Sequence, residues 1–210
     1  MADFTKCIGP QGTGLVCQLD AGTYTISSIL LIGRSNITIE GASASTPAAT
    51  VLQGAPDFTS GILSDSYTGS LTSITFRYLT FDGNRQGQTK AYTDFNQGEL
   101  SVSSTKSVLV ASTRFVNSPF IGFTIFGGCA QGIVMNNSYF GDEMIYGLWS
   151  DSLQPSTYLT CSNNQFADNV VVSNAQFEDI GEPAIFMNAT NIQLTNSIFH
   201  PGSRQLDYRI

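Results

Sequence analysis

Five segments of the chain resemble one another, and each is built around a phenylalanine. Each segment opens with two apolar residues that one residue separates, for example Ile74 and Phe76 or Val170 and Val172. An apolar residue at every second position is typical of a β-strand. A repeat of this length predicts a solenoid, in which every coil packs on its neighbours. The phenylalanines follow one another at intervals of 22–37 residues and are Phe81, Phe115, Phe140, Phe177 and Phe199.

A polar residue stands three positions before most of these phenylalanines. It is Ser112, Asn137, Asn174 or Asn196, and Tyr78 takes the same place in the first repeat. Asparagine tolerates a left-handed backbone and hydrogen-bonds its own turn. We therefore predict a sharp corner here, with side chains of successive coils hydrogen-bonded in a ladder. A second alternating strand follows each phenylalanine, so the unit reads as strand, corner, short strand, loop and strand.

This unit, with the segments "LDAGTYTI" (19–26) and "LTFDGNR" (79–85), resembles the right-handed β-helices of the pectate lyase and polygalacturonase superfamily. The resemblance covers residues 19–210. It implies an all-β chain that folds as a right-handed parallel β-helix of about seven coils, in one domain over residues 1–210. Residues 1–18 are expected to form an N-terminal cap segment. The last coil is expected to lack a C-terminal cap, and the inserted loops are 84–97 and 150–168.

The signature motifs of these enzymes are absent from the sequence. Polygalacturonases carry Asn-Thr-Asp, Asp-Asp, Gly-His-Gly and Arg-Ile-Lys, and pectate lyases carry Trp-Ile-Asp-His and Arg-x-Pro-x-x-Arg. The single histidine, His200, precedes Pro201 and is interpreted as a surface turn residue. The resemblance therefore predicts the fold, and any activity has to be argued from other residues.

The single tryptophan, Trp149, lies in the last strand of its repeat. Alignment of these strands directs Leu148 and Ser150 inward, so that Trp149 faces outward in one column with Phe186. A shift of one residue would bury Trp149 and Asp151 instead, and an ionised aspartate is rarely buried without a partner. Adjacent coils lie about 4.8 Å apart. The two aromatic residues thus predict an exposed surface on which the apolar face of a sugar ring can pack.

Acidic residues lie near this predicted surface. Hydrolysis of a glycosidic bond needs two carboxyl groups, about 5–5.5 Å apart for retention of configuration or about 6.5–9.5 Å apart for inversion. The predicted catalytic residues are Glu182 with Asp207, and Asp151 as a second acid or a group that orients the sugar. The two inserted loops are expected to wall a groove over the strands. The predicted substrate-binding residues are Trp149, Phe186, Tyr146, Asp142, Glu143 and Arg209.

Two other functions stay open. A lyase would cleave a uronide by β-elimination, which needs a base and a neutralised carboxylate, often with Ca²⁺. Arg209 is the best-placed base, with Tyr146 and Arg85 behind it. No cofactor is expected for hydrolysis, and calcium is expected only for a lyase. Alternatively, the β-helix binds a glycan without cleaving it or assembles end to end, as adhesins and fibre proteins do.

Composition and cysteines indicate the partners and the location. The net charge is −7, so the chain lacks the basic surface that nucleic-acid binding needs. No apolar run is long enough to insert into a membrane. The sequence begins without a signal peptide, yet Cys7 and Cys17 could close a small disulfide loop and Cys129 and Cys161 a second one. We therefore predict a secreted or cell-surface protein that binds a polysaccharide and self-associates through its open C-terminal coil.

Overall fold

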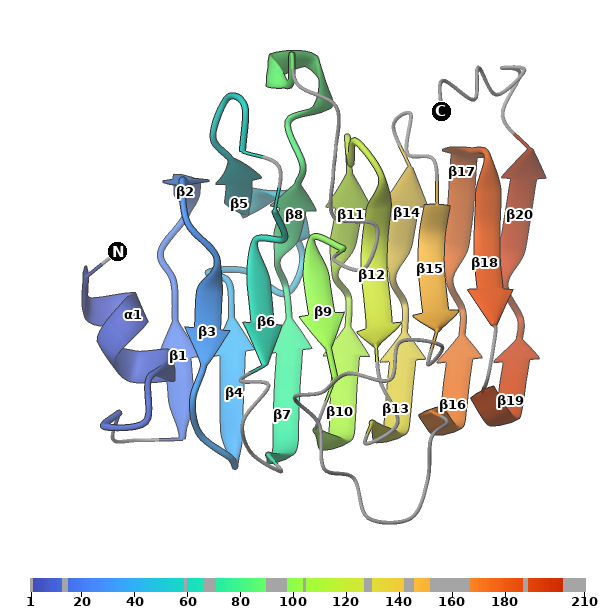
Figure 1. The fold of residues 1–210 in the computed structure, drawn as a ribbon, viewed down its shortest axis with the longest axis horizontal. Helices are drawn as coiled ribbons and strands as arrows, with labels where there is room; N and C mark the ends of the chain where they lie inside the picture. Colours follow the sequence, from blue (N-terminus) through green and yellow to red (C-terminus); the bar gives the residue numbers. More distant parts are fainter. Residues whose placement is uncertain are drawn as a thin grey trace.

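The computed structural model is a right-handed parallel β-helix with three sheets along its length (Figure 1). Each coil contributes one strand to every sheet. Six coils have all three strands, and a seventh has two within the described part of the chain, which confirms the predicted fold of about seven coils. The structure describes residues 2–12, 15–58, 60–65, 71–89, 98–103, 105–126, 130–141, 146–151, 167–186 and 189–201.

The sheets are named A, B and C in the order in which a coil passes through them. Sheet A consists of β1 (Val16–Gln18), β4 (Ile37–Glu40), β7 (Thr72–Arg77), β10 (Lys106–Ala111), β13 (Gln131–Asn136), β16 (Ala167–Ser173) and β19 (Ala189–Thr195). Sheet B consists of β2 (Gly22–Ile26), β5 (Thr50–Gly54), β8 (Thr80–Asp82), β11 (Arg114–Val116), β14 (Tyr139–Gly141), β17 (Gln176–Ile180) and β20 (Ile198–Pro201). Sheet C consists of β3 (Leu30–Ile32), β6 (Leu63–Asp65), β9 (Leu100–Val102), β12 (Ile121–Phe126), β15 (Tyr146–Asp151) and β18 (Glu182–Phe186).

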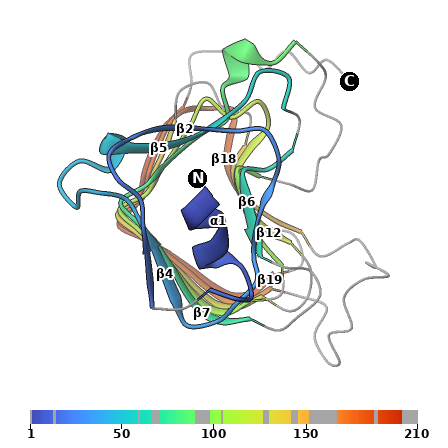
Figure 2. The same ribbon diagram turned by 90° about the vertical axis from the view of Figure 1, so that its left-hand side faces the viewer.

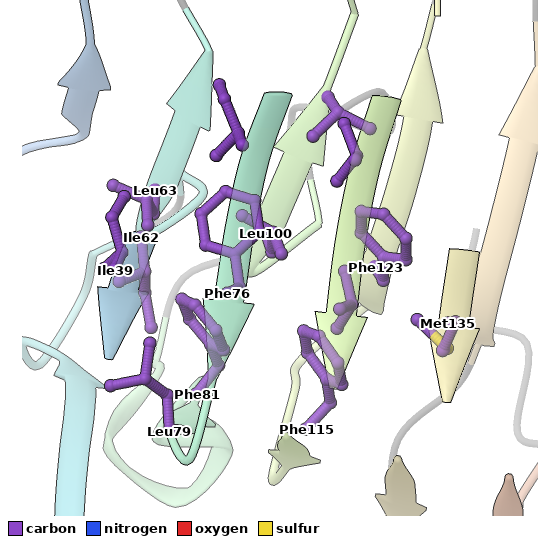
Figure 3. Close-up of a cluster of buried hydrophobic side chains, with 14 of the residues drawn as sticks. Ile39, Ile62, Leu63, Phe76, Leu79, Phe81, Leu100, Phe115, Phe123 and Met135 are labelled. Atoms are coloured by element: carbon purple, nitrogen blue, oxygen red, sulfur yellow. The ribbon is translucent and has the colours of Figure 1, made fainter. Parts of the chain in front are cut away.

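The repeated phenylalanines form one continuous stack, which is buried up to Phe177 and 40% exposed at Phe199. They are register partners in sheet B, and the centroids of neighbouring rings lie 4.8–5.3 Å apart. Figure 3 shows Phe81 and Phe115 pointing into the core beside Phe76, Leu100 and Phe123. An aromatic pair of this kind adds about 0.5–1.5 kcal/mol to the free energy of burial. The stack therefore fixes the register of the coils as well as filling the core.

The corner between sheets A and B has the predicted left-handed backbone. Tyr78, Ser112, Asn137, Asn174 and Asn196 all have φ between 48° and 59°. The side-chain ladder differs from the prediction, since the amide of Asn174 donates to Asn136, the residue before the corner, at 3.0 Å.

A second left-handed column stands at the start of sheet A and was not predicted. Each member directly precedes the first inward-facing apolar residue of its strand, and its φ lies between 52° and 64°. The polar or glycine residue at this place was the sequence signal for it. The column consists of Asn36, Ser73, Ser107, Gly132, Asn169 and Asn191.

A short helix closes the N-terminal end of the β-helix. Helix α1 (Ala2–Ile8) lies over the centre of the coil (Figure 2), with Phe4 and Ile8 buried against the core. A disulfide joins Cys7 to Cys17 in β1, which confirms the first predicted bridge. The second predicted bridge, Cys129 to Cys161, lies outside the described residues. Among those that are described, no helix is long and apolar enough to span a membrane.

Candidate functional site

The outer face of sheet C carries Trp149, as predicted. Leu148 and Ser150 on either side of it are each 1% exposed, whereas Trp149 is partly exposed. Strand β15 pairs with β12 so that Trp149 lies beside Thr124, and Leu148 lies beside the buried Phe123. The alternation of the strand therefore directs Trp149 away from the core.

The predicted aromatic column of Trp149 and Phe186 is wrong. In the pairing of β15 with β18, Trp149 lies beside Ile185, and Phe186 lies beside the inward-facing Ser150. The prediction took Ile185 as an inward residue because it is large and apolar. The hydrogen-bonded ladder instead aligns the smaller Ala184 with Leu148, and a shift of one residue exchanges the two faces of a strand.

Trp149 belongs instead to a cluster of three partly exposed aromatic residues. The rings of Trp149 and Tyr146 meet edge to face with centroids 4.7 Å apart, and Tyr146 meets Phe120 in the same way at 5.1 Å. Tyr146 was predicted to bind substrate, and the structure brings it against Trp149. Phe120 was missed, although an aromatic residue after Pro119 in a polar turn is a signal for it. The cluster presents ring surface from two adjacent coils at the start of their sheet C strands.

Two predicted catalytic residues lie on adjacent strands of sheet C, one at the start of its strand and the other at the end. Glu182 begins β18 and is the register partner of Tyr146, while Asp151 ends β15. Five strand positions separate them, which is about 16 Å at the rise of a β-strand. This backbone separation is too long for the retaining spacing of about 5–5.5 Å. Asp151 as a second acid at the inverting spacing stays a prediction. The remaining predicted residues, which lie outside the described part of the chain, are Asp142, Glu143, Asp207 and Arg209.

The first part of the predicted loop 84–97 is fixed to the preceding coil. The Asn84 amide donates to the Gly54 carbonyl and the Gln88 amide to the Ala55 carbonyl, both at 3.0 Å. The hydroxyl of Thr89 donates to Asp57 at 2.7 Å. A short 3₁₀ helix, η2 (Arg85–Gly87), lies within this segment. The other 3₁₀ helix, η1 (Pro47–Ala49), precedes β5. That the two inserted loops wall a groove stays a prediction.

An unpredicted buried acid stands at the corner between sheets B and C. Glu99 directly precedes β9 and is 2% exposed. The pKa of Glu99 is raised to about 8. Burial is the main cause, a hydrogen bond from Ser118 at 3.0 Å lowers the pKa, and the negative charge of Asp82 raises it. The neutral form of Glu99 is therefore favoured at pH 7. A Cβ on Gly83 would lie 2.3 Å from its carboxyl oxygen, so the acid is enclosed on that side.

Asp82 is held in a different way at the same corner. It accepts hydrogen bonds from the Gln53 amide at 2.9 Å and from the backbone N–H of Asn84 at 2.8 Å. Two carboxyl groups in unlike surroundings are a common arrangement for acid and base chemistry. Glu99 has almost no contact with solvent, however, and in this conformation it cannot touch a ligand. We assign it to the support of the corner.

Sheet B carries a further polar group on its outer face. Glu178 accepts hydrogen bonds from Gln176 and from the Tyr139 hydroxyl, and His200 lies 3.4 Å away. The contact with Gln176 is the main reason why the pKa of Glu178 is lowered, and His200 and Tyr139 add to it. His200 is exposed as predicted but lies in strand β20 rather than in a turn.

The described residues hold no group of three or more metal-ligating side chains. Calcium is expected only for a lyase, and the adjacent acids considered for it, Asp142 and Glu143, lie outside this part of the chain. A calcium requirement therefore stays a prediction.

Comparison with known proteins supports the fold. No protein-family model matches the sequence, and no curated protein matches it either. Among solved structures, the surface adhesin PfbA of Streptococcus pneumoniae has a TM-score of 0.58 at 13% identity, over 93% of this chain and 51% of PfbA. A candidate glycosyl hydrolase from Parabacteroides merdae has a TM-score of 0.55 at 13% identity, over 88% of this chain and 82% of its own.

A third similar structure is ORF18 of Geobacillus virus E2. Its TM-score is 0.54 at 12% identity, over 87% of this chain and 40% of the viral protein. The chain thus spans about half of PfbA or less than half of the viral protein. At such low identity these likenesses establish the parallel β-helix fold alone.

Proposed function

We propose that the protein is an extracellular, carbohydrate-active β-helix that binds a polysaccharide on the outer face of sheet C and hydrolyses it. The observation that carries the proposal is the aromatic cluster of Phe120, Tyr146 and Trp149. Sugar rings have apolar C–H faces that pack on aromatic rings. Burial of such a ring contributes about 1.5–3 kcal/mol to binding, which is enough to anchor one sugar.

The extracellular location is supported by the disulfide between Cys7 and Cys17, because disulfides persist mainly in oxidising compartments. Two of the similar structures agree with the proposal, since one is described as a surface adhesin and the other as a candidate glycosyl hydrolase. The second description favours a polysaccharide as the partner.

Hydrolysis is proposed to use Glu182, whose backbone is the register partner of Tyr146 in the cluster. Asp207 remains the proposed second carboxyl group. Asp151 is better suited to orienting a sugar, since about 16 Å of strand separates it from Glu182. Asp142, Glu143 and Arg209 remain proposed contacts to the substrate.

A second candidate function is glycan binding without cleavage. The observation in its favour is the same separation of Asp151 and Glu182, which is too long for these two residues to form a retaining pair. In that case the cluster around Trp149 would be the whole of the functional surface.

The test is a screen of the purified chain against xylan, β-1,3-glucan, α-1,3-glucan, polygalacturonate and polymannuronate, with and without calcium. New reducing ends without unsaturated uronides are expected. Glu182→Gln is expected to abolish cleavage and retain binding, whereas Trp149→Ala should weaken binding about 10–100-fold. Leu109→Ala is the matched control, because Leu109 is 37% exposed on sheet A and should leave both unchanged.

Three outcomes of the screen contradict hydrolysis. Unsaturated products would make the protein a lyase. Binding without any product would make it a glycan-binding protein. A folded chain that neither binds nor cleaves any of the five polysaccharides would overturn the carbohydrate function altogether.

A further inference from the structure

The outward-facing residues of sheet C form one column through four successive coils. Ser64 is the register partner of Ser101, Ser101 of Thr124, and Thr124 of Trp149. Their neighbours in the strands face the core and are buried. All four side chains therefore leave the sheet on the same side.

Burial changes abruptly along this column. Ser64 is 0% exposed, Ser101 is 1% exposed and Thr124 is 0% exposed, although all three face away from the core. Trp149, one coil further on, is partly exposed. The outer face is therefore covered over the second, third and fourth coils, and the cover ends between Thr124 and Trp149.

Gly98 forms part of the cover. Its backbone N–H donates to the Ser101 hydroxyl at 3.1 Å. A Cβ on Gly98 would lie 2.7 Å from the Thr124 hydroxyl oxygen and 3.1 Å from the Gly122 carbonyl oxygen, so the chain at Gly98 rests on the outside of β12. No larger residue fits there without a shift of the backbone. Gly98 therefore closes the outer face one coil before Trp149.

The contact between Gly98 and Thr124 is one of packing rather than of hydrogen bonding. The Thr124 hydroxyl is fully buried and has no hydrogen-bond partner within the described part of the chain. Gly98 thus presses on Thr124 without a polar contact to its side chain. A substitution that adds volume at Gly98 should displace the cover, whereas one that keeps the shape of Thr124 should leave it in position.

We infer that the polysaccharide site is closed toward the N-terminal coils, and that the protein recognises the end of a glycan chain rather than its interior. The inference rests on the proposed function. A chain that lies along the helix axis on Trp149 has to extend away from the fourth coil. It cannot extend over the fourth, because the cover at Gly98 and Thr124 occupies that space. A terminal sugar can stop at this wall, and an internal one cannot.

The inference is tested by titration with one polysaccharide at several chain lengths. We take the polysaccharide of the five that binds best and cut it with mild acid into fractions of about 1,000, 100 and 10 sugars. The fluorescence of the single tryptophan then reports binding before any cleavage. Recognition of chain ends predicts that the mass concentration for half-saturation falls roughly tenfold with each tenfold rise in the number of ends.

Substitutions at Gly98 and Thr124 test whether the cover formed by these residues is responsible. Gly98→Ala should weaken the dependence on chain ends, and the shape-conserving control Thr124→Val should keep it. If Gly98→Ala fails to fold by circular dichroism, Ser101→Ala, which removes the hydrogen bond to Gly98, takes its place. Half-saturation at the same mass concentration for all chain lengths would overturn the inference but not the proposed function. It would mean that the site binds the interior of a glycan chain. Absence of binding to all five polymers would overturn the proposed function, and the inference with it.

Discussion

Two buried carboxyl groups have very different surroundings, although one ends a strand of sheet C and the other directly precedes the next strand. Asp65, at the corner between sheets C and A, is 0% exposed and accepts hydrogen bonds from the Ser103 N–H, the Ser103 hydroxyl and the Thr105 hydroxyl at 2.6–3.0 Å. Glu99, at the corner between sheets B and C, is 2% exposed, and its pKa is raised to about 8. One acid is surrounded by donors of the next coil, and the other is enclosed beside the negative charge of Asp82.

The difference shows that a buried carboxyl group stabilises one corner of the coil and destabilises the other. Three donors satisfy the buried carboxyl group of Asp65, and the contact joins the second coil to the third. Glu99 is instead buried at a cost that favours its neutral form. Such unfavourable contacts gather near functional sites, and Glu99 directly follows Gly98, which covers the outer face beside Thr124. The hydrogen bonds of Asp65 thus stabilise the corner between sheets C and A. The proposed site lies next to the other corner, where Glu99 is buried.

The largest expected effect is at Asp65. Asp65→Ala leaves three donors of Ser103 and Thr105 buried without their acceptor, and it should lower the free energy of unfolding by about 3–5 kcal/mol. Urea denaturation measures the loss. Asp168 provides the control, because it accepts hydrogen bonds from Thr190 and Asn191 on an exposed surface, and Asp168→Ala should leave the midpoint almost unchanged. Equal midpoints for the two variants would remove the structural role assigned to Asp65.

The next effect is a pH dependence at Glu99. The folded chain holds a proton on Glu99 up to a pKa of about 8, whereas the usual value is 4.5. Stability from this group is therefore greatest below pH 4.5 and falls as the pH rises to 8. The expected loss between pH 5 and pH 7.5 is about 3 kcal/mol. Glu99→Gln, which cannot ionise, should remove this slope in urea denaturation at several pH values.

Glu178 supplies the control for the pH experiment. The pKa of Glu178 is lowered, so its contribution to stability is lost only as the pH falls through the acidic range. Glu178→Gln should therefore keep the slope between pH 5 and pH 7.5. Identical slopes for the wild type and Glu99→Gln would show that Glu99 is not the group responsible.

The smallest effect concerns Gly83, which lies against Glu99, and Gly54, which ends β5 in the preceding coil. A Cβ on Gly83 would lie 2.3 Å from the Glu99 carboxyl and 2.7 Å from the Ser118 Cα, so Gly83→Ala should cost about 1–3 kcal/mol. A Cβ on Gly54 would meet its nearest atom at 3.4 Å. Gly54→Ala should be neutral or slightly stabilising. Equal melting temperatures for the two variants would mean that Glu99 is not tightly enclosed.

The sequence was sufficient to predict the features that repeat in every coil. The repeat, the left-handed corner at Asn137 and Asn174, and the outward direction of Trp149 all follow from alternation and spacing. The stacking of the phenylalanines was not predicted. A solenoid repeats one local rule, so a pattern of residues close in sequence predicts the structure. The Cys7–Cys17 bridge was predictable for the same reason, because only ten positions separate the two residues.

Features that depend on one coil meeting the next were not predictable. Phe186 was misaligned because Gly181 alone connects β17 to β18, and the ladder rather than the size of Ile185 sets the register. The burial of Asp65 depends on donors 38 and 40 positions away, and that of Glu99 on Ser118 in the next coil. No local pattern indicates which of the 16 acidic residues meets such partners.

The most direct test of the account is a fluorescence titration of the wild-type chain, because Trp149 is its single tryptophan and lies at the centre of the proposed site. A sugar that packs on the ring removes water from it. The account predicts a saturable blue shift with at least one of the five polysaccharides and none with polyethylene glycol, a polymer without sugar rings or tryptophan, at the same mass concentration. Unchanged emission with every polysaccharide, from a chain that is folded by circular dichroism, would contradict the claim that this face of sheet C binds glycan.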